Sequence, residues 1–366
     1  MKKSLQCFKW SLLALSVGLS SGVAAEEKYD VMQFLEAVTL PENGIGAREA
    51  GTEKEQSTAD YVMQQFKAMG YAPQVHEFRH PVLNKKGVFL DSSNIIADVK
   101  GLSEKMLVLG AHFDSTGSKV GSQGAMDNGA GLSVMLTVAK KMSQEKKLPY
   151  TIRFIAFGAE EIGKVGSRAY VEMLKEDKPE ELAKIVGMVN LDTVAGGDFL
   201  YVHSAHTTPY KCGGNNDNYT SETQMREAVL MASKEQLGDE AHKIHPEFPG
   251  YPEGVTGDWS DHESFACNGI PIAYIETTNF QINGKDGYDG YSQSVNPGLW
   301  DCFDAESVTA CDREKETQWG RIWHSGNDQL IHLESVFPGR IESQLNANVK
   351  VLNAFFSQAD KYLNVD

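Results

Sequence analysis

The sequence predicts an α/β fold, a doubly wound and mixed but mostly parallel sheet with helices on both faces. Apolar runs short enough to be buried strands alternate along the chain with helical patterns, and this alternation is typical of doubly wound sheets. The chain has 366 residues, of which 41% are hydrophobic and 23% charged, so we expect a single globular domain over residues 26–366. The predicted buried strands cover residues 106–110, 152–157, 185–191 and 269–276.

The predicted helices lie between and after these strands. Residues 56–69 place apolar side chains on one side, as an amphipathic helix does. A second helical pattern opens at Asp127 and Asn128. Residues 203–220 and 279–320 lack regular patterning and are predicted to be long loops that wall a pocket. Further helices are predicted over 164–174, 222–235 and 338–362, and an extended segment over 87–100.

The charge balance narrows the range of partners. The chain contains 34 Lys and Arg against 50 Asp and Glu, a formal net charge of −16 at pH 7. An acidic surface argues against nucleic acid or an anionic membrane as the partner, because both are polyanions. The same surplus of acids weakly favours cationic substrates.

The first 25 residues have the features of a secretory signal peptide. Lys2, Lys3 and Lys9 form a basic region, residues 11–19 an apolar stretch, and residues 23–25 a small-residue cleavage site. The apolar stretch is too short for a spanning helix, and no Cys follows it to carry a lipid. We therefore expect a periplasmic or secreted protein without a stable membrane anchor; the alternative is an N-terminal membrane anchor.

The cysteines fit an exported protein. Cys7 would leave with the signal peptide, and an even number remains, which favours two disulfides with three possible connectivities. Cys302–Cys311 would close a short loop and is the first choice, and Cys212–Cys267 would then follow. The alternative is that these thiols are free and buried.

Six residues form an almost complete set for a site with two metal ions. Two hard cations held close together need a shared carboxylate, terminal nitrogen and oxygen ligands, and a nearby base that is not a ligand. Three of the motifs concerned fall directly after predicted strands, where doubly wound sheets bind their ligands. The six residues are His112, Asp127, Glu160, Glu161, Asp192 and His324.

The two histidines of this set each have a carboxylate close by in the sequence. A ligating imidazole needs its second nitrogen held by an acceptor. Asp114 follows His112 by two positions, and Asp328 could orient His324 in the same way. The alternative, a structural histidine, is the more common role for a lone His after a strand. Of the remaining histidines, His262 in the segment SDHESF is interpreted as a core or pocket-wall residue.

The acidic members of the set have distinct predicted roles. Asp127 either bridges two cations or caps a helix N-terminus, and Asn128 could take over the capping. Glu160 and Glu161 would repel each other after a buried strand unless a cation is present. We assign Glu161 to the metal and Glu160 to proton transfer; the alternative is a solvated acidic turn. Asp192 ends the third predicted strand as a further metal ligand.

The motifs, in their order along the chain, resemble family M28 of co-catalytic zinc metallopeptidases. The resemblance runs from about residue 45 to 362, and it includes GAHFDS at 110–115, MDNGAG at 126–131, GAEEIG at 158–163, NLDTV at 190–194 and WHSGND at 323–328. Further segments are similar to the bacterial subgroup of alkaline phosphatase isozyme conversion aminopeptidases. They are SDHESFACNGIP (260–271), IETTNF (275–280), GKDGY (284–288) and FPGRIE (337–342).

This resemblance implies a zinc-dependent exopeptidase fold of the phosphorylase/hydrolase-like type and an aminopeptidase that acts on the N-termini of peptides or proteins. It also implies that Glu160 is the general acid and base. Trp323 stands where many family members carry a Tyr whose hydroxyl assists the oxyanion, and an indole can only donate. The resemblance further implies two zinc ions, one held by His112 and Asp192, the other by Glu161 and His324, with Asp127 bridging them and Asp114 behind His112.

The same subgroup is associated with removal of N-terminal Arg, and the sequence contains a region that could recognise it. A buried carboxylate can hold a guanidinium through two hydrogen bonds, and Glu276 at a strand end is the candidate. Asp261 and Trp323 are also expected at the substrate pocket. The alternative is ordinary surface acidity. The acid-rich region comprises Asp258, Asp261, Glu263, Glu276 and Asp286.

Three other functions remain open at this level. A carboxypeptidase or dipeptidase of the same family would need a basic pocket for the substrate carboxylate, and few Arg lie near the motifs. A catalytically inactive binding homologue should have lost Glu160 or a ligand, and none is missing. A phosphoesterase would show more His and more phosphate-binding Arg, Lys or Gly-rich turns. Manganese or cobalt could replace zinc on the same nitrogen and oxygen ligands.

Overall fold

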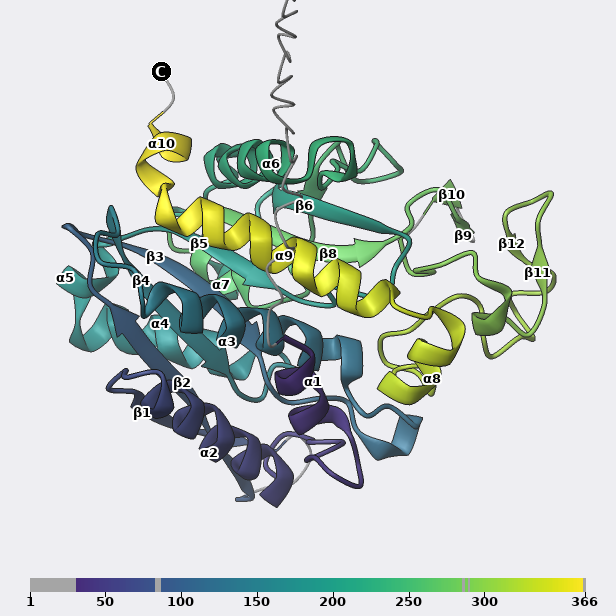
Figure 1. Ribbon diagram of the computed structural model, residues 1–366, viewed down its shortest axis with the longest axis horizontal. Coiled ribbons are helices and arrows are strands. Elements are labelled where there is room, and N and C mark those ends of the chain that lie inside the picture. The colour runs from purple at the N-terminus through teal and green to yellow at the C-terminus, as the bar shows by residue number, and fades with distance from the viewer. Residues whose placement is uncertain (1–30, 83–86, 285–286, 289, 365–366) are drawn as a thin grey trace, which may run out of the picture.

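The computed structural model describes residues 31–82, 87–284, 287–288 and 290–364. Its centre is an eight-stranded sheet in the order β1-β2-β4-β3-β5-β8-β6-β7, with helices packed on both sides (Figure 1). The α/β fold class predicted from the sequence is therefore confirmed. The strands are β1 Gln74–Pro81, β2 Phe89–Val99, β3 Ser103–His112, β4 Tyr150–Phe157, β5 Ile185–Leu191, β6 Phe199–Ala205, β7 Val255–Thr256 and β8 Ile272–Thr278.

The middle of the sheet is parallel and its flanks are mixed. Strands β4, β3, β5 and β8 pair in parallel in that spatial order. On one side β2 pairs antiparallel with β4 and with β1, and on the other β6 pairs antiparallel with β8 and parallel with β7. The predicted strands at 106–110, 152–157, 185–191 and 269–276 are these four central ones. Their fully buried, near-continuous apolar runs are what a doubly covered parallel strand requires.

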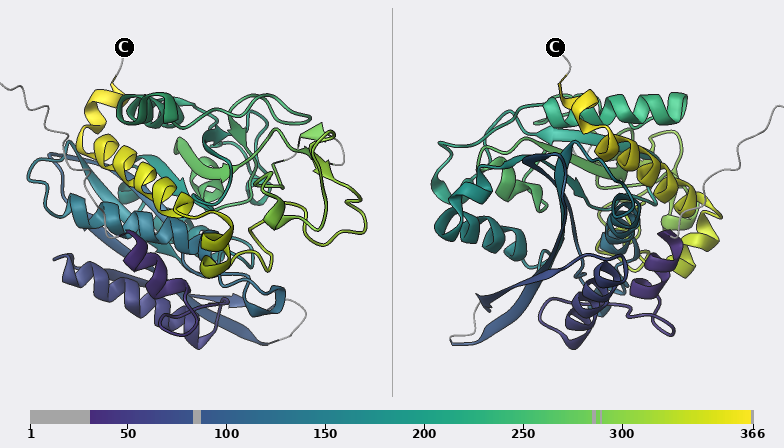
Figure 2. Two further views of the ribbon diagram at one scale, coloured as in Figure 1. Left: turned by 45° about the vertical axis from the view of Figure 1, so that its right-hand side comes forward. Right: turned by 60° about the vertical axis from the view of Figure 1, so that its left-hand side comes forward.

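One face of the sheet carries the larger helical layer, which is seen edge-on in the right-hand view of Figure 2. Its core includes Phe66, Leu136 and Phe355, all fully buried. Removing such large apolar side chains from water is the main favourable term in folding. The helices of this layer are α1 Val31–Thr39, α2 Glu53–Ala68, α3 Gly131–Met142, α6 Gln224–Leu237, α9 Arg340–Ser357 and α10 Ala359–Leu363.

The opposite face carries α4 Val165–Asp177, α5 Pro179–Leu182 and α7 His262–Ala266. Rings from the sheet and from two of these helices form its core. Phe157, Tyr170 and Phe265 are fully buried and their ring centroids lie 6.2–6.5 Å apart. The Cys212–Cys267 disulfide joins the end of α7 to the loop after β6.

Two helix boundaries differ from the prediction. Asp127 and Asn128 do not open a regular helix, because Asp127 has φ −113° and ψ 87° and Asn128 has φ −132° and ψ 43° within the irregular turn η2 Ala125–Ala130. Helix α3 begins only at Gly131, whose N–H donates to Asn128 Oδ1 at 3.0 Å. The long C-terminal helix predicted over 338–362 is interrupted at Gln358, which has φ −131° and ψ 34°.

The described residues between 279 and 329 form an irregular wall beside the sheet, on the right of Figure 1. It is predominantly loop, as predicted, and is followed by α8 Leu330–Val336. The structure pairs Cys302 with Cys311 inside it. Its regular pieces are the short pairs β9 Asn283–Gly284 with β10 Gly287–Tyr288 and β11 Phe303–Asp304 with β12 Thr309–Ala310, and the turn η5 Pro297–Leu299.

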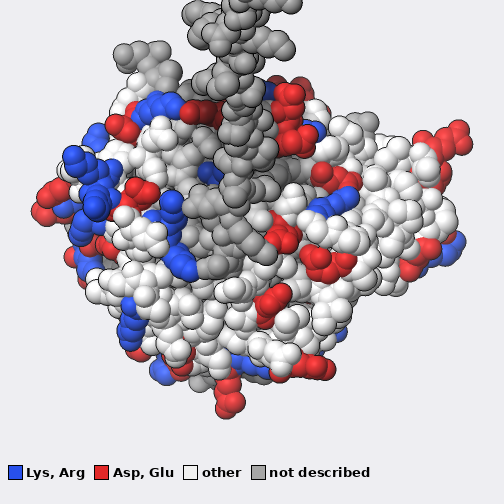
Figure 3. All heavy atoms as spheres, in the orientation of Figure 1, with Lys and Arg blue, Asp and Glu red and all other residues white. Residues whose placement is uncertain are grey.

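Two predictions concern residues outside the described part of the chain: the signal peptide at 1–25, and Asp286. Within the described ranges, no helix has both the length and the apolar character needed to cross a bilayer. On the face seen in Figure 3, Asp and Glu side chains alternate with Lys and Arg rather than forming one acidic field. The remaining short turns are η1 Ser118–Val120, η3 Cys212–Gly214 and η4 Gly238–Glu240.

Candidate metal centre

The carboxyl ends of three parallel strands bring the predicted site residues to one edge of the sheet. His112 is the last residue of β3, Glu160 and Glu161 follow β4, and Asp192 follows β5. Neighbouring parallel strands end at the same edge, so residues far apart in sequence become neighbours there. Asp127 reaches this edge from the turn before α3.

Asp127 lies between two histidines and offers one oxygen to each side. His112 Nε2 is 3.2 Å from Asp127 Oδ1 and 3.4 Å from Asp192 Oδ1. His324 Nε2 is 3.3 Å from Asp127 Oδ2 and 2.7 Å from Glu161 Oε2. The five side chains thus form two His–carboxylate pairs that share one carboxylate.

The buried polar atoms of this cluster lack the hydrogen bonds that a protein-only site would need. His112 is 1% exposed, and within the described residues its Nε2, Glu161 Oε1 and Asp192 Oδ1 have no hydrogen-bond partner. Burial, and after it the charge of Asp127, raises the pKa of Glu161 well above its usual range. Burial also raises the pKa of Asp192. Such a crowd of buried carboxylates is stable when a cation is bound among them.

Asp114 supports three parts of the cluster with one buried carboxylate. Its Oδ1 lies 3.5 Å from His112 Nδ1, on the side of the ring away from Asp127. The same carboxylate accepts the backbone N–H of Glu160 at 2.9 Å and of Glu161 at 3.1 Å. The sequence predicts only the contact with His112. The structure adds that Asp114 fixes the turn carrying both glutamates.

Asp328 does not orient the His324 ring, so the prediction for this residue is wrong. Its carboxylate accepts the N–H of Met126 at 2.6 Å, the N–H of Asp127 at 3.4 Å and the hydroxyl of Ser122 at 3.0 Å. It therefore holds the turn that presents Asp127. Asp328 follows His324 by four positions, so a local contact between them is expected. Instead, the chain after His324 turns back, and Asp328 contacts the 122–127 segment.

A buried arginine that the sequence analysis did not single out completes this support. Arg48 is fully buried, and its guanidinium donates to the carbonyl oxygens of Phe113 at 2.5 Å, Gln123 at 3.0 Å and Gly124 at 2.8 Å. Burial lowers the pKa of Arg48 despite the nearby charge of Asp328. Arg48 ties the end of β3 to the segment before Asp127. No local pattern marks it, since the partners are backbone carbonyls distant in sequence.

The residues around the cluster include several with strained backbones. Ala159 has φ 54°, Thr193 has φ 50° and His324 has φ 50°, all in the left-handed region that non-glycine residues rarely adopt. Ala159 precedes Glu160, Thr193 follows Asp192, and His324 is a member of the cluster. Strained residues persist where surrounding structure holds them, and they concentrate at functional sites.

Glu160 is the one acid of the predicted set that stands beside the cluster without joining it. The other three acids, Asp127, Glu161 and Asp192, each have a carboxylate oxygen within 3.4 Å of His112 Nε2 or His324 Nε2, and among the described contacts Glu160 has none of this kind. It is 8% exposed and lines the neighbouring cavity. Burial raises the pKa of Glu160 well above its usual range, and the charge of Asp261 adds to the shift.

With this geometry in place, the comparison with known proteins is decisive. Residues 94–348 match peptidase family M28. The chain belongs to peptidase family M28. It is 29% identical over 324 residues to the alkaline phosphatase isozyme conversion protein of Escherichia coli, covering 83% of this chain and 84% of that one. It is 44% identical over 265 residues to aminopeptidase YwaD of Bacillus subtilis, covering 70% of this chain and 48% of that one.

Solved structures show the same fold. A zinc aminopeptidase from Bacillus subtilis matches with a TM-score of 0.61 at 18% identity, over 90% of this chain and 94% of that one. A glutaminyl cyclase from Porphyromonas gingivalis matches with a TM-score of 0.58 at 18% identity, over 92% and 98%. Since the fold hosts both activities, the fold alone does not decide what this M28 member does.

A cavity of about 700 Å³ opens beside the M28 site. Asp127, Glu160, Asp192 and His324 reach it, and so does Trp323, whose ring lies 4.8 Å from that of His324. Large apolar and aromatic walls with a few polar groups are typical of small-ligand sites. The aromatic walls include Phe248, Tyr251, Trp259, Tyr274, Phe280 and Trp319.

Of the acidic residues predicted near the pocket, Glu276 lines the cavity and Asp261 does not. Glu276 Oε1 lies 2.8 Å from His203 Nε2, and burial raises the pKa of Glu276 to about 7. Asp261 is fully buried and does not line the cavity, so its expected place on the pocket surface is wrong. Glu263 is paired with Arg168 at 2.7 Å.

His262, interpreted from the sequence as a core or pocket-wall residue, is fully buried. Its Nε2 lies 2.8 Å from the carbonyl oxygen of Gly257. Burial lowers the pKa of His262 to about 3, so the ring is neutral at physiological pH. These contacts place it in the core beside Tyr274, whose ring centroid is 4.9 Å away.

Proposed function

We propose that this M28 peptidase is an exported aminopeptidase that uses two zinc ions to remove N-terminal residues from peptides or proteins. The observation that carries the proposal is the position of Asp127, with one oxygen facing His112 and Asp192 and the other facing Glu161 and His324. Glu160 stands free beside them. A relative and a structural neighbour described as aminopeptidases support the choice of reaction.

The donor set suits the proposed metal. His112 and Asp192 would hold one zinc ion, Glu161 and His324 the other, and Asp127 would be shared. Imidazole nitrogen and carboxylate oxygen are ordinary zinc ligands. When bound, a pair of such ions lowers the pKa of a water molecule towards neutrality and polarises the scissile carbonyl.

The residues of the chain would carry the proton transfers. Glu160 takes a proton from the attacking water and returns it to the amine that leaves. Burial raises the pKa of Glu160, which favours return of the proton to the leaving amine. Asp114 keeps the Glu160 and Glu161 backbone in place, and the aromatic walls of the cavity limit the access of bulk water.

A preference for basic N-terminal residues is the finer part of the proposal. Glu276 is a carboxylate in the wall of the cavity, beside the rings of Tyr274 and Phe280. A carboxylate can hold a guanidinium through two hydrogen bonds, and aromatic faces stack on its plane. The features therefore suit an arginine side chain better than a short aliphatic one.

Export is proposed on two features of the chain. Residues 1–25 have the pattern of a secretory signal peptide. Two disulfides are present among the described residues, and structural disulfides persist in oxidising compartments. We therefore propose a periplasmic or secreted enzyme.

Zinc analysis combined with a substrate panel tests the function. Purified protein would be assayed on Arg-, Lys-, Leu- and Ala-p-nitroanilides, with and without a chelator. We expect two bound zinc ions per chain, loss of hydrolysis on chelation and recovery on adding zinc. Peptides with a blocked C-terminus should still be cut, unlike the substrates of a carboxypeptidase. Fastest cleavage of Leu would remove the Arg preference, and no cleavage by zinc-loaded protein would remove the aminopeptidase proposal.

A further inference from the structure

The cavity also has a basic side, which the sequence analysis did not anticipate. Arg313 and Arg321 both line it, in a chain whose formal net charge is −16. The Arg321 guanidinium carbon lies 4.9 Å from the ring centre of Trp319 and 5.2 Å from that of Trp323. Arg313 packs on the same Trp319 ring at 4.3 Å. Arg321 lies only three positions before His324, so it belongs to the immediate surroundings of the metal centre.

Arg321 is half-buried and has no carboxylate partner among the described residues. Its one described hydrogen bond goes to the carbonyl oxygen of His324 at 3.4 Å, although a guanidinium has five N–H donors. Burial lowers the pKa of Arg321, and the nearby charge of Arg313 lowers it further. A partly desolvated cation beside a second cation is costly unless an anion joins it.

Five other arginines of the protein differ from Arg321. Each of them has a carboxylate within ion-pair distance, and none of them lines the cavity. Fully buried Arg48 instead fills its donors with carbonyl oxygens. Arg321 is therefore an exception that needs an explanation. The five pairs are Arg79–Asp91, Arg153–Asp98, Arg168–Glu263, Arg226–Glu227 and Arg340–Asp198.

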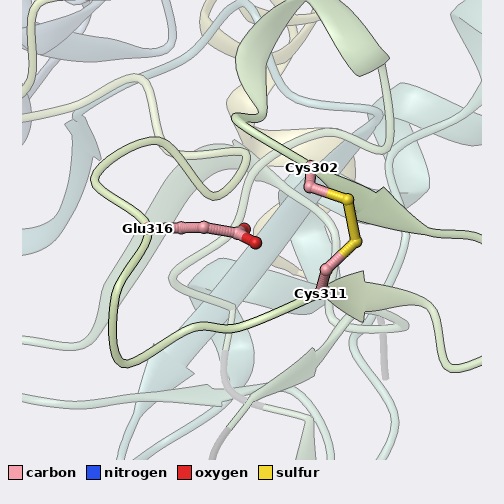
Figure 4. A group of neighbouring side chains, drawn as sticks. All are labelled: Cys302, Cys311 and Glu316. Carbon is pink, nitrogen blue, oxygen red and sulfur yellow. A yellow bond between two sulfur atoms is a disulfide. The ribbon is translucent and has the colours of Figure 1, made fainter.

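The loop that carries this basic side is held firmly. Gln293 Oε1 accepts the N–H of Ile322 and of Trp323, each at 2.9 Å. The Cys302–Cys311 disulfide closes the preceding loop, with the Glu316 side chain directed towards it (Figure 4). Both sulfurs are used in this bond, so the three residues do not form a thiolate metal site. A binding group fixed in advance loses little entropy when its ligand arrives.

The basic and acidic sides of the cavity are separate. Glu276 lies on β8, with Oε1 2.8 Å from His203 Nε2. Arg321 lies on the loop before His324, against the rings of Trp319 and Trp323, and no ion pair joins it to Glu276 among the described residues. The cavity thus has an acidic side at Glu276 and a basic side at Arg321. A peptide with a free amine and a free carboxyl group likewise has one positive and one negative end. Its ammonium end would avoid Arg321, which leaves this side chain for a group beyond the scissile bond.

We propose that Arg321, packed against Trp319 and Trp323, binds a substrate carboxylate on the leaving-group side of the scissile bond. This inference rests on the proposed aminopeptidase function and narrows its substrate class to short peptides with a carboxylate close to the cut. The carboxylate is either the peptide's own C-terminus or an Asp or Glu side chain. In this role Arg321 is a specificity-determining residue. The proposed roles of Glu160 in proton transfer and of the ligands in metal binding are unchanged.

Peptide pairs that differ only in the carboxylate test the inference. With X the residue released fastest from the p-nitroanilides, kcat/KM would be measured for X-Ala-Ala, X-Ala-Ala-amide and X-Ala-Glu-amide. We expect the free acid to exceed X-Ala-Ala-amide by about 10- to 100-fold, as for a hydrogen-bonded charge pair. If X-Ala-Glu-amide is cleaved as fast as the free acid, the site binds acidic side chains as well as the C-terminal carboxylate. If it is cleaved as slowly as X-Ala-Ala-amide, the site binds only the C-terminal carboxylate.

Variants of Arg321 identify the residue responsible. Arg321→Gln should reduce the ratio of acid to amide cleavage to near one, and Arg321→Lys should keep part of it because the charge remains but the planar fork is lost. Arg79→Gln is the matched control, since it removes one positive charge from the exposed β1–β2 pair and should leave the ratio unchanged. The melting temperature of each variant would also be measured. If Arg321 only packed against the two indoles, its replacement would lower the melting temperature and leave the ratio of acid to amide cleavage unchanged.

The two proposals fail in different ways. Equal cleavage of acid and amide by the wild-type enzyme would overturn the role of Arg321 and leave the aminopeptidase function standing. A large ratio that persists in folded Arg321→Gln would do the same. Zinc-loaded protein that cleaves neither the p-nitroanilides nor any of the peptides would overturn the aminopeptidase function itself.

Discussion

The strand-end edge of the sheet and the loop wall that faces it are built by different means. At the edge, His112, Glu160 and Asp192 occupy the ends of β3, β4 and β5 or follow them directly, and the sheet sets their spacing. In the wall, Trp319 and Arg321 come from an irregular segment held by a disulfide and side-chain contacts. The difference suggests a division of labour in which the edge supplies Glu160 and most of the proposed metal ligands, while the wall selects the substrate and adds one ligand, His324.

The largest effect should come from the edge. Glu160→Gln keeps the size of the side chain and removes the acid, so we expect kcat to fall by about 100- to 10,000-fold, the range for loss of a general acid or base. Zinc content and melting temperature should stay at wild-type values, measured by metal analysis and calorimetry. Glu172→Gln, on the exposed surface of α4, is the matched control. Turnover close to wild type in Glu160→Gln would remove the assignment of chemistry to this edge.

The next effect concerns the support beneath the edge. Asp328→Asn removes a charge that accepts the N–H groups of Met126 and Asp127. Residues behind metal ligands typically contribute about 10- to 100-fold to metal affinity, and we expect a loss of that size in competition with a chromogenic chelator. Activity should return at excess zinc. Unchanged zinc affinity would mean that the Asp127 turn is held without Asp328.

Asp328 also illustrates where prediction from the sequence ends. The central strands and the six site residues could be predicted because hydrophobic periodicity and strand ends are local signals that the sheet converts into proximity. The partner of Asp328 could not, because it depends on how the chain folds back beneath the 122–127 turn. Arg48 was missed for the same reason, since its partners are carbonyl oxygens of segments far along the chain.

The flanking elements of the fold show a related limit. Strand β1 was not predicted, because its residues alternate between exposed and half-buried positions and lack an apolar run. Strand β6 was not predicted either, and the loop predicted at 203–220 overlaps its last three residues. Asp127 and Asn128 carry a helix-like pattern, but the turn that presents Asp127 delays α3 to Gly131. In each case tertiary packing overrides a weak local preference.

A smaller effect should appear at Glu276, which lies on β8 and lines the cavity, as a change of specificity with pH. Burial raises the pKa of Glu276 to about 7, so its charged fraction rises from about one tenth at pH 6 to about nine tenths at pH 8. The preference for Arg- over Leu-p-nitroanilide should therefore increase several-fold, up to about tenfold, across this range. Glu276→Gln should give a ratio that does not change with pH. A ratio that rises equally in both proteins would exclude Glu276 as the group that recognises Arg.

The smallest expected effect is a change in KM without a change in kcat, which would separate substrate selection from chemistry. Removing Cys302–Cys311 by a double Ser substitution frees a loop of 9 residues, with a cost of about 3 kcal/mol in the chain-entropy estimate. We expect KM for peptides to rise by about three-fold with kcat nearly unchanged, since the loss affects uniform binding.

Removing Cys212–Cys267 is the matched control for that prediction. It frees 55 residues and should lower the free energy of unfolding more, by about 4 kcal/mol. Its KM should stay closer to wild type, because this bond joins the loop after β6 to α7, and neither segment lines the cavity, whereas Arg313, two positions after Cys311, does. If loss of Cys302–Cys311 lowered kcat instead, this bond would also be needed to hold His324 at the metal centre, because a loop that only selects the substrate cannot slow the reaction of bound substrate.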